Sequence, residues 1–283
     1  MTAALAGPAP AVDLDERVEF LRGLAASAGA LARVGFVRRT QSQIAYKGPQ
    51  DFLTETDSAV ENHIKSQISA AFPRDGFLGE ETGSEVLGDN LWVVDPIDGT
   101  ANFARAIPHF CISIAFVSRG RTMLGAIYNP ALDELYIARR GGGAELNGVP
   151  IRVAITADPA VACVELGWSR RVPQDVYVDT LERLLNCGAN VRRGASGALA
   201  LAYVADGRSD CYAELHMQPW DCLAGLLLVE EAGGVVVPFL ERDGLSKGGA
   251  VLAVAPALAE LMSEATRIDL GLRRAFAGLG VQA

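Results

Sequence analysis

The period of the hydrophobic residues changes along this chain, and that change is the strongest constraint on what it can fold into. In the first quarter of the chain, apolar residues recur in two stretches at the spacing of an amphipathic helix. From Leu91 to Ala138 they instead form short runs rich in β-branched and aromatic residues, separated by turn dipeptides. Beyond Pro150, strand-like and helix-like segments alternate. The pattern predicts an α+β first half with a mixed and antiparallel sheet, and an α/β second half.

Cap and turn signals set the expected elements. Asp13 followed by Glu16 is typical of a helix N-terminus, and the polar segment 41–56 is expected to form an irregular or hairpin connection. The predicted helices cover residues 13–31, 57–71, 174–186, 196–205, 219–233 and a last stretch from 256. The predicted strands cover residues 91–94, 111–117, 123–128, 134–138, 162–166, 190–193, 209–214, 235–238 and 250–254. We expect two domains, residues 1–155 and 156–283.

The balance of charge limits the ligands of this chain. Its 283 residues are half hydrophobic, enough for one large or two modest globular domains. The 25 Lys and Arg against 34 Asp and Glu leave a net charge of −9 and a pI near 4.9. An acidic protein binds nucleic-acid backbones poorly, so nucleic acid is not expected as the primary ligand. An anionic ligand would need cations gathered locally.

The cysteines and the N-terminus indicate the compartment. Five scattered cysteines without any C-x-x-C spacing argue against a disulfide framework or a zinc ribbon and favour thiols in a reducing cytosol. Residues 1–12 have no Lys or Arg before their apolar residues, so they are not typical of a signal peptide. No uncharged apolar run reaches the roughly 18 residues that span a bilayer. We expect a soluble cytoplasmic protein without a membrane partner.

The segment from Trp92 to Phe103 brings two carboxylates together. An apolar strand ends in Asp95, a proline forces a turn, and Asp98 returns three residues later beside flexible Gly99. Carboxylates this close repel one another unless they share a proton or a cation, and Mg²⁺ prefers such oxygen ligands. The alternative is that Asp98 and Gly99 form only a turn and Asp95 only ends a strand. This segment alone leaves both interpretations open.

Four further acidic residues are ambiguous in the same way. Glu80 and Glu81 follow an apolar pair that predicts a short strand, but adjacent acids on a loop are commonly just solvated. Asp57 opens the second predicted helix, where it is as easily an N-cap as a catalytic partner. Asp221 opens an apolar helix, where an acidic residue is ordinary capping. Each of these residues, taken alone, has a structural explanation.

Taken in order, four sequence blocks resemble the signature blocks of the inositol monophosphatase family. The blocks are Asp51–Asp57, Gly79–Glu81, Trp92–Phe103 and Trp220–Gly225. The third, WVVDPIDGTANF, is long and therefore very specific, and the match spans about residues 45 to 240. The resemblance implies a layered αβαβα sandwich of the sugar-phosphatase type and a Mg²⁺-dependent phosphatase. It also implies the homodimer and the lithium sensitivity that are usual among relatives.

The metal ligands follow from this resemblance. Glu80, Asp95 and the carbonyl oxygen of Ile97 would hold one Mg²⁺. Asp95, Asp98 and Asp221 would hold a second, and two or three ions are expected in all. Such ions would lower the pKa of a bound water and stabilise the leaving alkoxide.

The resemblance also implies how water is activated. Thr100 and Asp57 match the pair that orients the nucleophile, with Glu80 on the same side. Gly99 and Thr100 begin a predicted short helix, residues 100–106, whose free N–H groups would receive the phosphate.

The substrate side is less determined. Glu214 stands where relatives hydrogen-bond a polyol hydroxyl, and Ser196 lies in the loop opposite, although Ser196 also suits the N-cap of the following helix. Asp98 and Asp221 are expected to contact the substrate as well, while Lys47 is either a lysine of the site loop or a solvated side chain. The favoured substrate is a small phosphorylated polyol or sugar, above all inositol-1-phosphate. Histidinol phosphate, fructose 1,6-bisphosphate and a nucleotide phosphate are the alternatives within the family.

A rival of another class is a regulatory protein that binds a partner while keeping the phosphatase fold. It would show a basic exposed patch and dispensable metal ligands. This chain keeps a carboxylate at every expected metal position and is acidic overall, so the regulatory reading ranks second.

Overall fold

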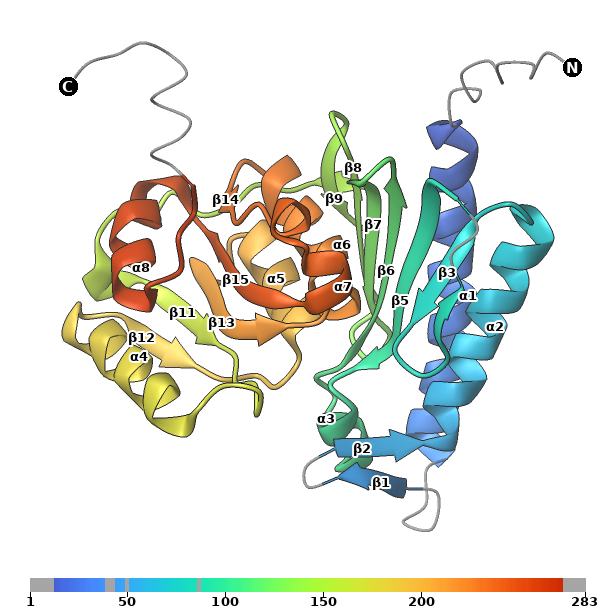
Figure 1. Ribbon diagram of the computed structural model, residues 1–283, viewed down its shortest axis with the longest axis horizontal. Helices are drawn as coiled ribbons and strands as arrows, with labels where there is room; N and C mark the ends of the chain where they lie inside the picture. The colour runs from blue at the N-terminus through green and yellow to red at the C-terminus, as the bar shows by residue number, and fades with distance from the viewer. Residues whose placement is uncertain (1–12, 39–43, 49–50, 86–87, 272–283) are drawn as a thin grey trace, which may run out of the picture.

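A computed structural model describes residues 13–38, 44–48, 51–85 and 88–271 of the chain. Helices and sheets alternate in five layers: two helices, a large sheet, two helices, a smaller sheet and two outer helices (Figure 1). This is the αβαβα sandwich that the resemblance implies. The antiparallel-rich sheet of the first half and the α/β arrangement of the second half are both confirmed.

The first layer consists of α1 (Leu14–Arg38) and α2 (Glu55–Ala71). Asp13 caps α1 as expected, because its Oδ1 accepts hydrogen bonds from the backbone N–H groups two and three residues later, at 3.0 and 3.2 Å. Pro73 follows the end of α2 and prevents its continuation.

Helix α1 belongs to the core. Among the described residues it is the one helix long and apolar enough, by length and composition, to cross a membrane. Its Leu21, Ala25 and Ala28 are nevertheless almost fully buried in the cluster that joins the helices to the large sheet. The apolar composition of α1 is therefore explained by packing within this fold.

The large sheet has the strand order β10-β9-β8-β7-β6-β5-β3-β4. All neighbours are antiparallel except β3 and β5, which run parallel. Strand β6 is buried along its whole length because helices cover both faces, which explains its almost continuous apolar run. The strands are β3 (Gly76–Gly79), β4 (Gly83–Glu85), β5 (Asn90–Asp98), β6 (Cys111–Ser118), β7 (Arg121–Asn129), β8 (Glu134–Arg139), β9 (Gly143–Leu146) and β10 (Val149–Pro150).

The middle layer consists of α5 (Gly197–Ala205) and α6 (Pro219–Glu231), which lie between the two sheets (Figure 1). Both helices are apolar on every side. All residues of α5 from Ala198 to Ala205 are buried, as are those of α6 from Cys222 to Val229. A helix that is apolar all round must be covered all round, which accounts for the position of both helices between sheets.

The smaller sheet has the order β12-β11-β13-β15-β14. Strand β11 runs parallel to β12 and β13, whereas β15 runs antiparallel to β13 and β14. Helices α4 (Gln174–Asn186) and α8 (Ala259–Thr266) form the outer layer. The strands are β11 (Cys163–Leu166), β12 (Asn190–Arg192), β13 (Cys211–Met217), β14 (Val235–Val236) and β15 (Gly249–Val254).

Short elements complete the fold. Strands β1 (Ile44–Gly48) and β2 (Asp51–Thr54) pair antiparallel, so of the irregular and hairpin connections expected before α2 the structure has the hairpin. Helix α3 (Thr100–Ala104) lies beside this hairpin (Figure 1), and α7 (Gly244–Lys247) precedes β15.

The remaining differences from the predicted elements concern the ends of elements, short strands, and short helical segments such as α7 that were not predicted. The sequence analysis missed β4, β9 and β10, which are too short to show a period. The equally short β12 and β14 were predicted because they fall within the alternating second half. Helix α3 stops two residues earlier than predicted, and Ala106 takes a left-handed φ of 67°. The predicted boundary near residue 155 falls between β10 and β11. The division into two domains stays a prediction.

Candidate active site

Strand β5 ends in the two carboxylates that the sequence analysis singled out. Asp95 pairs with Ser113 and Asp98 pairs with Cys111. Three residues along β5 therefore correspond to only two along β6, and the register of the strand pairing shifts there. The shift follows from Pro96, which has no N–H for the ladder. The N–H of Ile97 turns back and donates to Asp95 Oδ1 at 2.9 Å. The bulge therefore presents both carboxylates at one end of the sheet.

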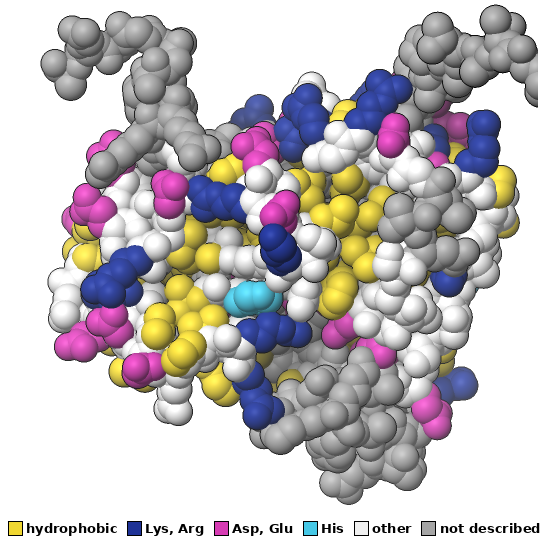
Figure 2. Space-filling view, viewed as in Figure 1, with side chains coloured by type: hydrophobic (Ala, Val, Ile, Leu, Met, Phe, Trp, Pro, Cys, Tyr) yellow, Lys and Arg dark blue, Asp and Glu magenta, His cyan; other side chains and the backbone are white. Residues whose placement is uncertain are grey.

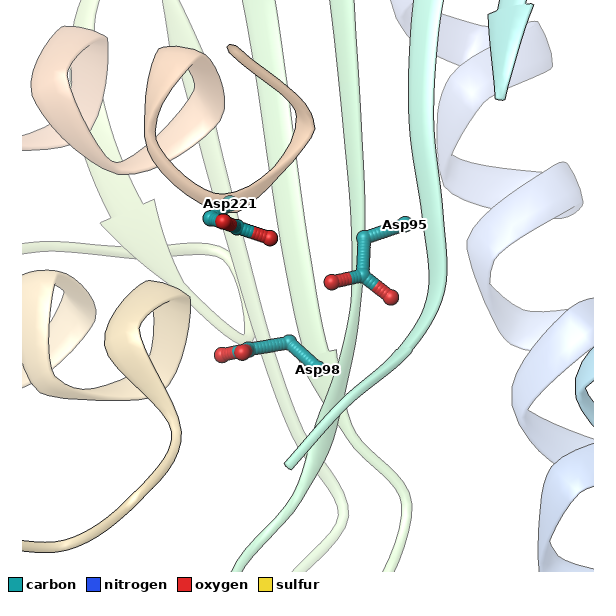
Figure 3. A group of neighbouring side chains, drawn as sticks. All are labelled: Asp95, Asp98 and Asp221. Carbon is teal, nitrogen blue, oxygen red and sulfur yellow. The ribbon is translucent and has the colours of Figure 1, made fainter. Parts of the chain in front are cut away.

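Asp221 joins them from a distant part of the chain. It is the third residue of α6, where its Oδ2 accepts the N–H of Gln218 at 3.2 Å. One carboxylate oxygen from each of Asp95, Asp98 and Asp221 lies within 4.8 Å of the others. Figure 3 shows the three side chains pointing into one space between β5 and α6. The helix cap and the cluster therefore use the same side chain.

Glu80 reaches the same cluster from the end of β3. Its N–H donates to the carbonyl oxygen of Val94 on β5 at 3.2 Å, which continues the pairing of the parallel strands. Its carboxyl group is near enough to Asp95 to form a hydrogen bond and to raise the pKa of Asp95. The structure thus brings Glu80 together with the three aspartates.

Burial is the main cause that raises the pKa values of the aspartates. For Asp95 the charges of Glu80, Asp98 and Asp221 raise the pKa further. For Asp221 the charges of Glu80, Asp98 and Glu214 do the same. Within the described part of the chain, no Lys or Arg forms an ion pair with any of the three aspartates. A buried set of hard oxygen donors without a cationic side chain fits divalent cations such as Mg²⁺.

Thr100 and Asp57 lie next to this cluster. The Oγ1 of Thr100 is 2.9 Å from the carbonyl oxygen of Ile97 and 3.4 Å from Asp57 Oδ1, so its single proton can be donated to either acceptor. Burial raises the pKa of Asp57 to about 6. The N-cap of α2 is Thr54, and Asp57 is the third helical residue whose Oδ2 accepts the N–H of Thr54 at 3.0 Å. Asp57 therefore completes the helix cap and also faces Thr100.

Gly99 provides a backbone conformation that the turn requires. Its φ of 95° is left-handed, and a Cβ there would lie 3.1 Å from the carbonyl oxygen of His109 and 3.2 Å from Ser196 Cβ. Three residues later, the amide of Asn102 donates to the carbonyl oxygens of His109 and Gly194 at 2.7 and 2.9 Å. The DGTAN segment thus connects the two halves of the chain.

Ser196 occupies the N-cap position of α5, but its hydroxyl does not cap the helix. It donates to Asp98 Oδ2 at 2.6 Å, and the N–H of Ala198 donates to the same oxygen at 2.7 Å. These bonds lower the pKa of Asp98, against the larger effect of burial that raises it. Ser196 therefore holds Asp98 instead of capping α5, and its contact with the substrate stays a prediction.

A cavity of about 260 Å³ opens over the cluster. Glu214 lines it, accepts the hydroxyl of Tyr212 at 2.5 Å, and has its pKa raised to about 7, mainly by burial. Gly167 makes room for this pair, because a Cβ there would lie 2.0 Å from Glu214 Oε2. The predicted site residues among the lining are Glu80, Asp98, Gly99, Thr100, Ser196, Glu214 and Asp221.

Sequence reasoning missed several residues of this site. Tyr212, Glu165 and Arg193 line the cavity, and Asn102 stood within a recognised block without an assigned role. Alternation along β11 and β13 would have placed the first two on sheet faces but not in a cavity. The side chain of Lys47 lies outside the described part of the structure.

An αβαβα sandwich with carboxylates clustered between its sheets defines the class of metal-dependent sugar phosphatases. The sequence profile named Inositol monophosphatase family matches residues 13–269. This chain belongs to the inositol monophosphatase family. The family is metal-dependent, typically through Mg²⁺, in agreement with the buried acidic cluster.

Individual relatives agree with this membership. The chain is 37% identical over 251 residues to the protein named Nus factor SuhB of Escherichia coli K12, which covers 87% of this chain and 94% of that protein. It is 42% identical over 197 residues to the inositol-1-monophosphatase of Rhizobium meliloti, covering 68% and 74%. The crystal structure of the extragenic suppressor protein SuhB from Bartonella henselae matches with a TM-score of 0.82 and 31% identity, over 89% of this chain and 99% of that one.

Proposed function

We propose that this protein uses Mg²⁺ to hydrolyse a phosphate monoester of a small polyol, with inositol-1-phosphate as the favoured substrate. The observation that carries the proposal is the meeting of Asp95, Asp98 and Asp221 within 4.8 Å, beside Glu80 and with no described cationic partner for the aspartates. A phosphate dianion is repelled by such a cluster unless cations are bound first. Histidinol phosphate, fructose 1,6-bisphosphate and nucleotide phosphates remain alternative substrates.

The carboxylates divide into two proposed ligand sets. Glu80, Asp95 and the carbonyl oxygen of Ile97 form one set, and Asp95, Asp98 and Asp221 form the other. Bound Mg²⁺ supplies a water of lowered pKa and neutralises charge on the phosphoryl oxygens. The protein contributes the fixed positions of these oxygens.

Thr100 and Asp57 are the proposed proton path. In this role Thr100 Oγ1 accepts a proton from the attacking water while it donates its own to Asp57 Oδ1, now 3.4 Å away. The pKa of about 6 lets Asp57 accept a proton near neutral pH. Gly99 and Thr100, at the cavity wall, are proposed to contact the phosphate.

Glu214 is proposed to recognise the alcohol. Its Oε2 is held by Tyr212, and the carboxyl group faces the cavity between the two sheets. Hydrogen bonds from substrate hydroxyls to this carboxyl group would orient the leaving alcohol. From family membership we also expect a homodimer, a cytoplasmic location and inhibition by lithium.

A second candidate function is regulatory partner binding, since relatives bear the name Nus factor. Figure 2 shows acidic and basic side chains interspersed over one face of the molecule, without a continuous basic field among the coloured residues. This arrangement favours a phosphatase over a general nucleic-acid binder. Both functions can reside in one protein, because partner binding need not use the cavity.

Phosphate release from a panel of monoesters, with and without Mg²⁺, tests the proposed function. Asp98→Asn removes a ligand charge from the cluster, so we expect kcat/KM to fall by about two orders of magnitude or more while the circular dichroism spectrum is retained. Asp175→Asn, at an exposed position in the first turn of α4, is the matched control and should keep full activity. Undiminished turnover by Asp98→Asn would refute the site, and equal rates on all esters would refute the preference for inositol-1-phosphate.

A further inference from the structure

Trp168 is the large apolar side chain of the cavity wall that remains accessible. The other three, Leu166, Tyr212 and Met217, are each 2% exposed or less, whereas Trp168 is 37% exposed. Trp168 is also the one aromatic residue among the exposed large hydrophobic residues of the described part of the chain. Single exposed apolar residues are common on protein surfaces, so the exposure matters here because it occurs in the wall of the cavity. The accessible ring therefore indicates a contact surface for a ligand.

Two neighbouring side chains keep the Trp168 ring in place. Tyr177 on α4 meets it edge to face, with the ring centres 6.5 Å apart and an angle of 63° between the ring planes. The guanidinium carbon of Arg193, the residue after β12, lies 5.9 Å from the centre of the same ring. A tryptophan side chain has only two rotatable bonds, and here both neighbours restrict it further. Little conformational entropy is therefore lost when a ligand packs on this ring.

A hydrogen-bond acceptor lies close to the ring in the same wall. Gly167, directly before Trp168, leaves room for Glu214, because a Cβ at Gly167 would lie 2.0 Å from Glu214 Oε2. The cavity thus offers a carboxyl group for hydroxyls and an aromatic face for C–H groups. A saturated ring that bears hydroxyls presents both, with O–H groups at its edge and C–H groups on its faces. An open-chain polyol has no such face.

The size of the cavity limits the ligand further. Its volume of about 260 Å³ is below the roughly 300–1,000 Å³ typical of small-molecule sites. A single ring with one phosphate group suits this space better than a nucleotide, which carries a base in addition to its sugar.

We propose that Trp168 is a specificity-determining residue whose ring packs against one face of a saturated ring in the leaving alcohol. The inference rests on the proposed function, because it concerns the alcohol part of the same substrate. Glu214 accepts hydroxyls at the edge of that ring while Trp168 covers its face. The contact is already made in the bound ground state, so it acts on KM more than on kcat.

The ratio of kcat/KM for inositol 1-phosphate to that for glycerol 1-phosphate tests this inference, because only the first ester has a ring. We expect a wild-type ratio well above ten. Trp168→Leu should reduce it about tenfold, mainly through KM for the ring ester, and Trp168→Phe should keep most of it because an aromatic face remains. Both esters are measured on one preparation, so a loss of folded protein cancels from the ratio.

Leu132→Ala is the control, since Leu132 is exposed between β7 and β8 and does not line the cavity. It should leave the ratio unchanged. A wild-type ratio near one, or a ratio that Trp168→Leu does not alter, would overturn the inference. The same holds if a nucleoside monophosphate is preferred to inositol 1-phosphate, since the ring would then stack on a base.

Size-exclusion chromatography separates this role from a contact between copies of the chain. If Trp168→Leu changes the oligomeric state and leaves the ratio unaltered, the ring serves such a contact and the inference is overturned. The proposed function is tested separately by the same measurements. Mg²⁺-dependent turnover of both esters at a ratio near one refutes the role of Trp168 and leaves the phosphatase reaction intact, whereas no Mg²⁺-dependent turnover of any ester refutes the proposed function itself.

Discussion

Asp98 links the two halves of the chain through the hydrogen bonds that its carboxylate accepts. It lies at the end of β5, yet its Oδ2 accepts hydrogen bonds from Ser196 and Ala198 at the start of α5. One carboxylate oxygen therefore takes the place of a helix cap, while the group as a whole lies within the cluster. A carboxylate that is hydrogen-bonded in this way keeps one orientation, which favours a defined ligand geometry.

Ser196→Ala tests this role at the scale of one residue. Loss of the donor leaves Asp98 less well oriented, and a hydrogen bond to a charged group contributes about 1.5–3 kcal/mol. We expect the Mg²⁺ concentration for half-maximal activity to rise about tenfold, with Ser196→Thr close to wild type because the hydroxyl remains. Ser66→Ala, at an exposed position on α2, is the control. An unchanged Mg²⁺ requirement in Ser196→Ala would show that Ser196 does not position Asp98.

At the scale of elements, helix α2 holds the loop that carries Glu80. The fully buried Glu61 accepts the N–H groups of Glu81 and Thr82 at 2.9 and 2.8 Å. Gly79 makes this contact possible, because a Cβ there would lie 2.5 Å from Glu61 Cδ. The sequence analysis did not single out Glu61, since a glutamate within a helix is more often solvated. Its contact with the loop depends on how α2 packs on β3 and is not visible in the spacing of residues.

Glu61→Gln tests the support of this loop. The amide keeps one acceptor oxygen but turns an NH₂ group toward a backbone N–H, so one buried hydrogen bond is lost at about 1–3 kcal/mol. We expect a lower melting temperature together with a severalfold higher Mg²⁺ requirement, measured where the variant is still folded. Glu19→Gln, at an exposed position on α1, should change neither quantity. A variant that is destabilised but keeps the wild-type Mg²⁺ requirement would limit Glu61 to a structural role.

At the scale of the whole molecule, the fold buries several carboxyl groups close to one another. Burial raises the pKa of Asp57 to about 6 and that of Glu214 to about 7, and it also raises the pKa values of Asp95, Asp98 and Asp221. A group whose pKa is higher in the folded state stabilises that state when protonated. The metal-free protein therefore loses stability as the pH rises from below about 4, the ordinary range of these carboxyl groups, through 6 to 7. His109 acts in the opposite sense because burial lowers its pKa, but it is one group against these carboxylates.

Thermal melting at two pH values tests this effect of the whole cavity. In a chelator, we expect the melting temperature to be lower at pH 7.5 than at pH 5.5 by on the order of 5 °C. Addition of Mg²⁺ should raise it more at pH 7.5, because more of the carboxylates are then charged. Sodium chloride at equal ionic strength is the control for general screening. A metal-free protein that melts higher at pH 7.5 would contradict the predicted direction.

The sequence by itself determined the class and order of the main elements and the family, because these depend on local properties. Helical and strand periods, the cap at Asp13 and the turn at Pro96 involve residues within a few positions of one another. The block from Trp92 to Phe103 also indicated the acidic cluster. Strands β4, β9 and β10 were missed, since two to four residues offer too few positions for a period.

The spacing of the residues did not show which distant side chains meet: the family resemblance implied that Asp221 joins Asp95 and Asp98, and the tertiary structure supplies the contacts that bring them together. The contact of Asp221 with β5 depends on α6 packing between the two sheets, and the bond from Ser196 to Asp98 depends on where α5 begins. Such distances follow from the packing of whole layers, which is set by many buried contacts at once rather than by the spacing of any few residues.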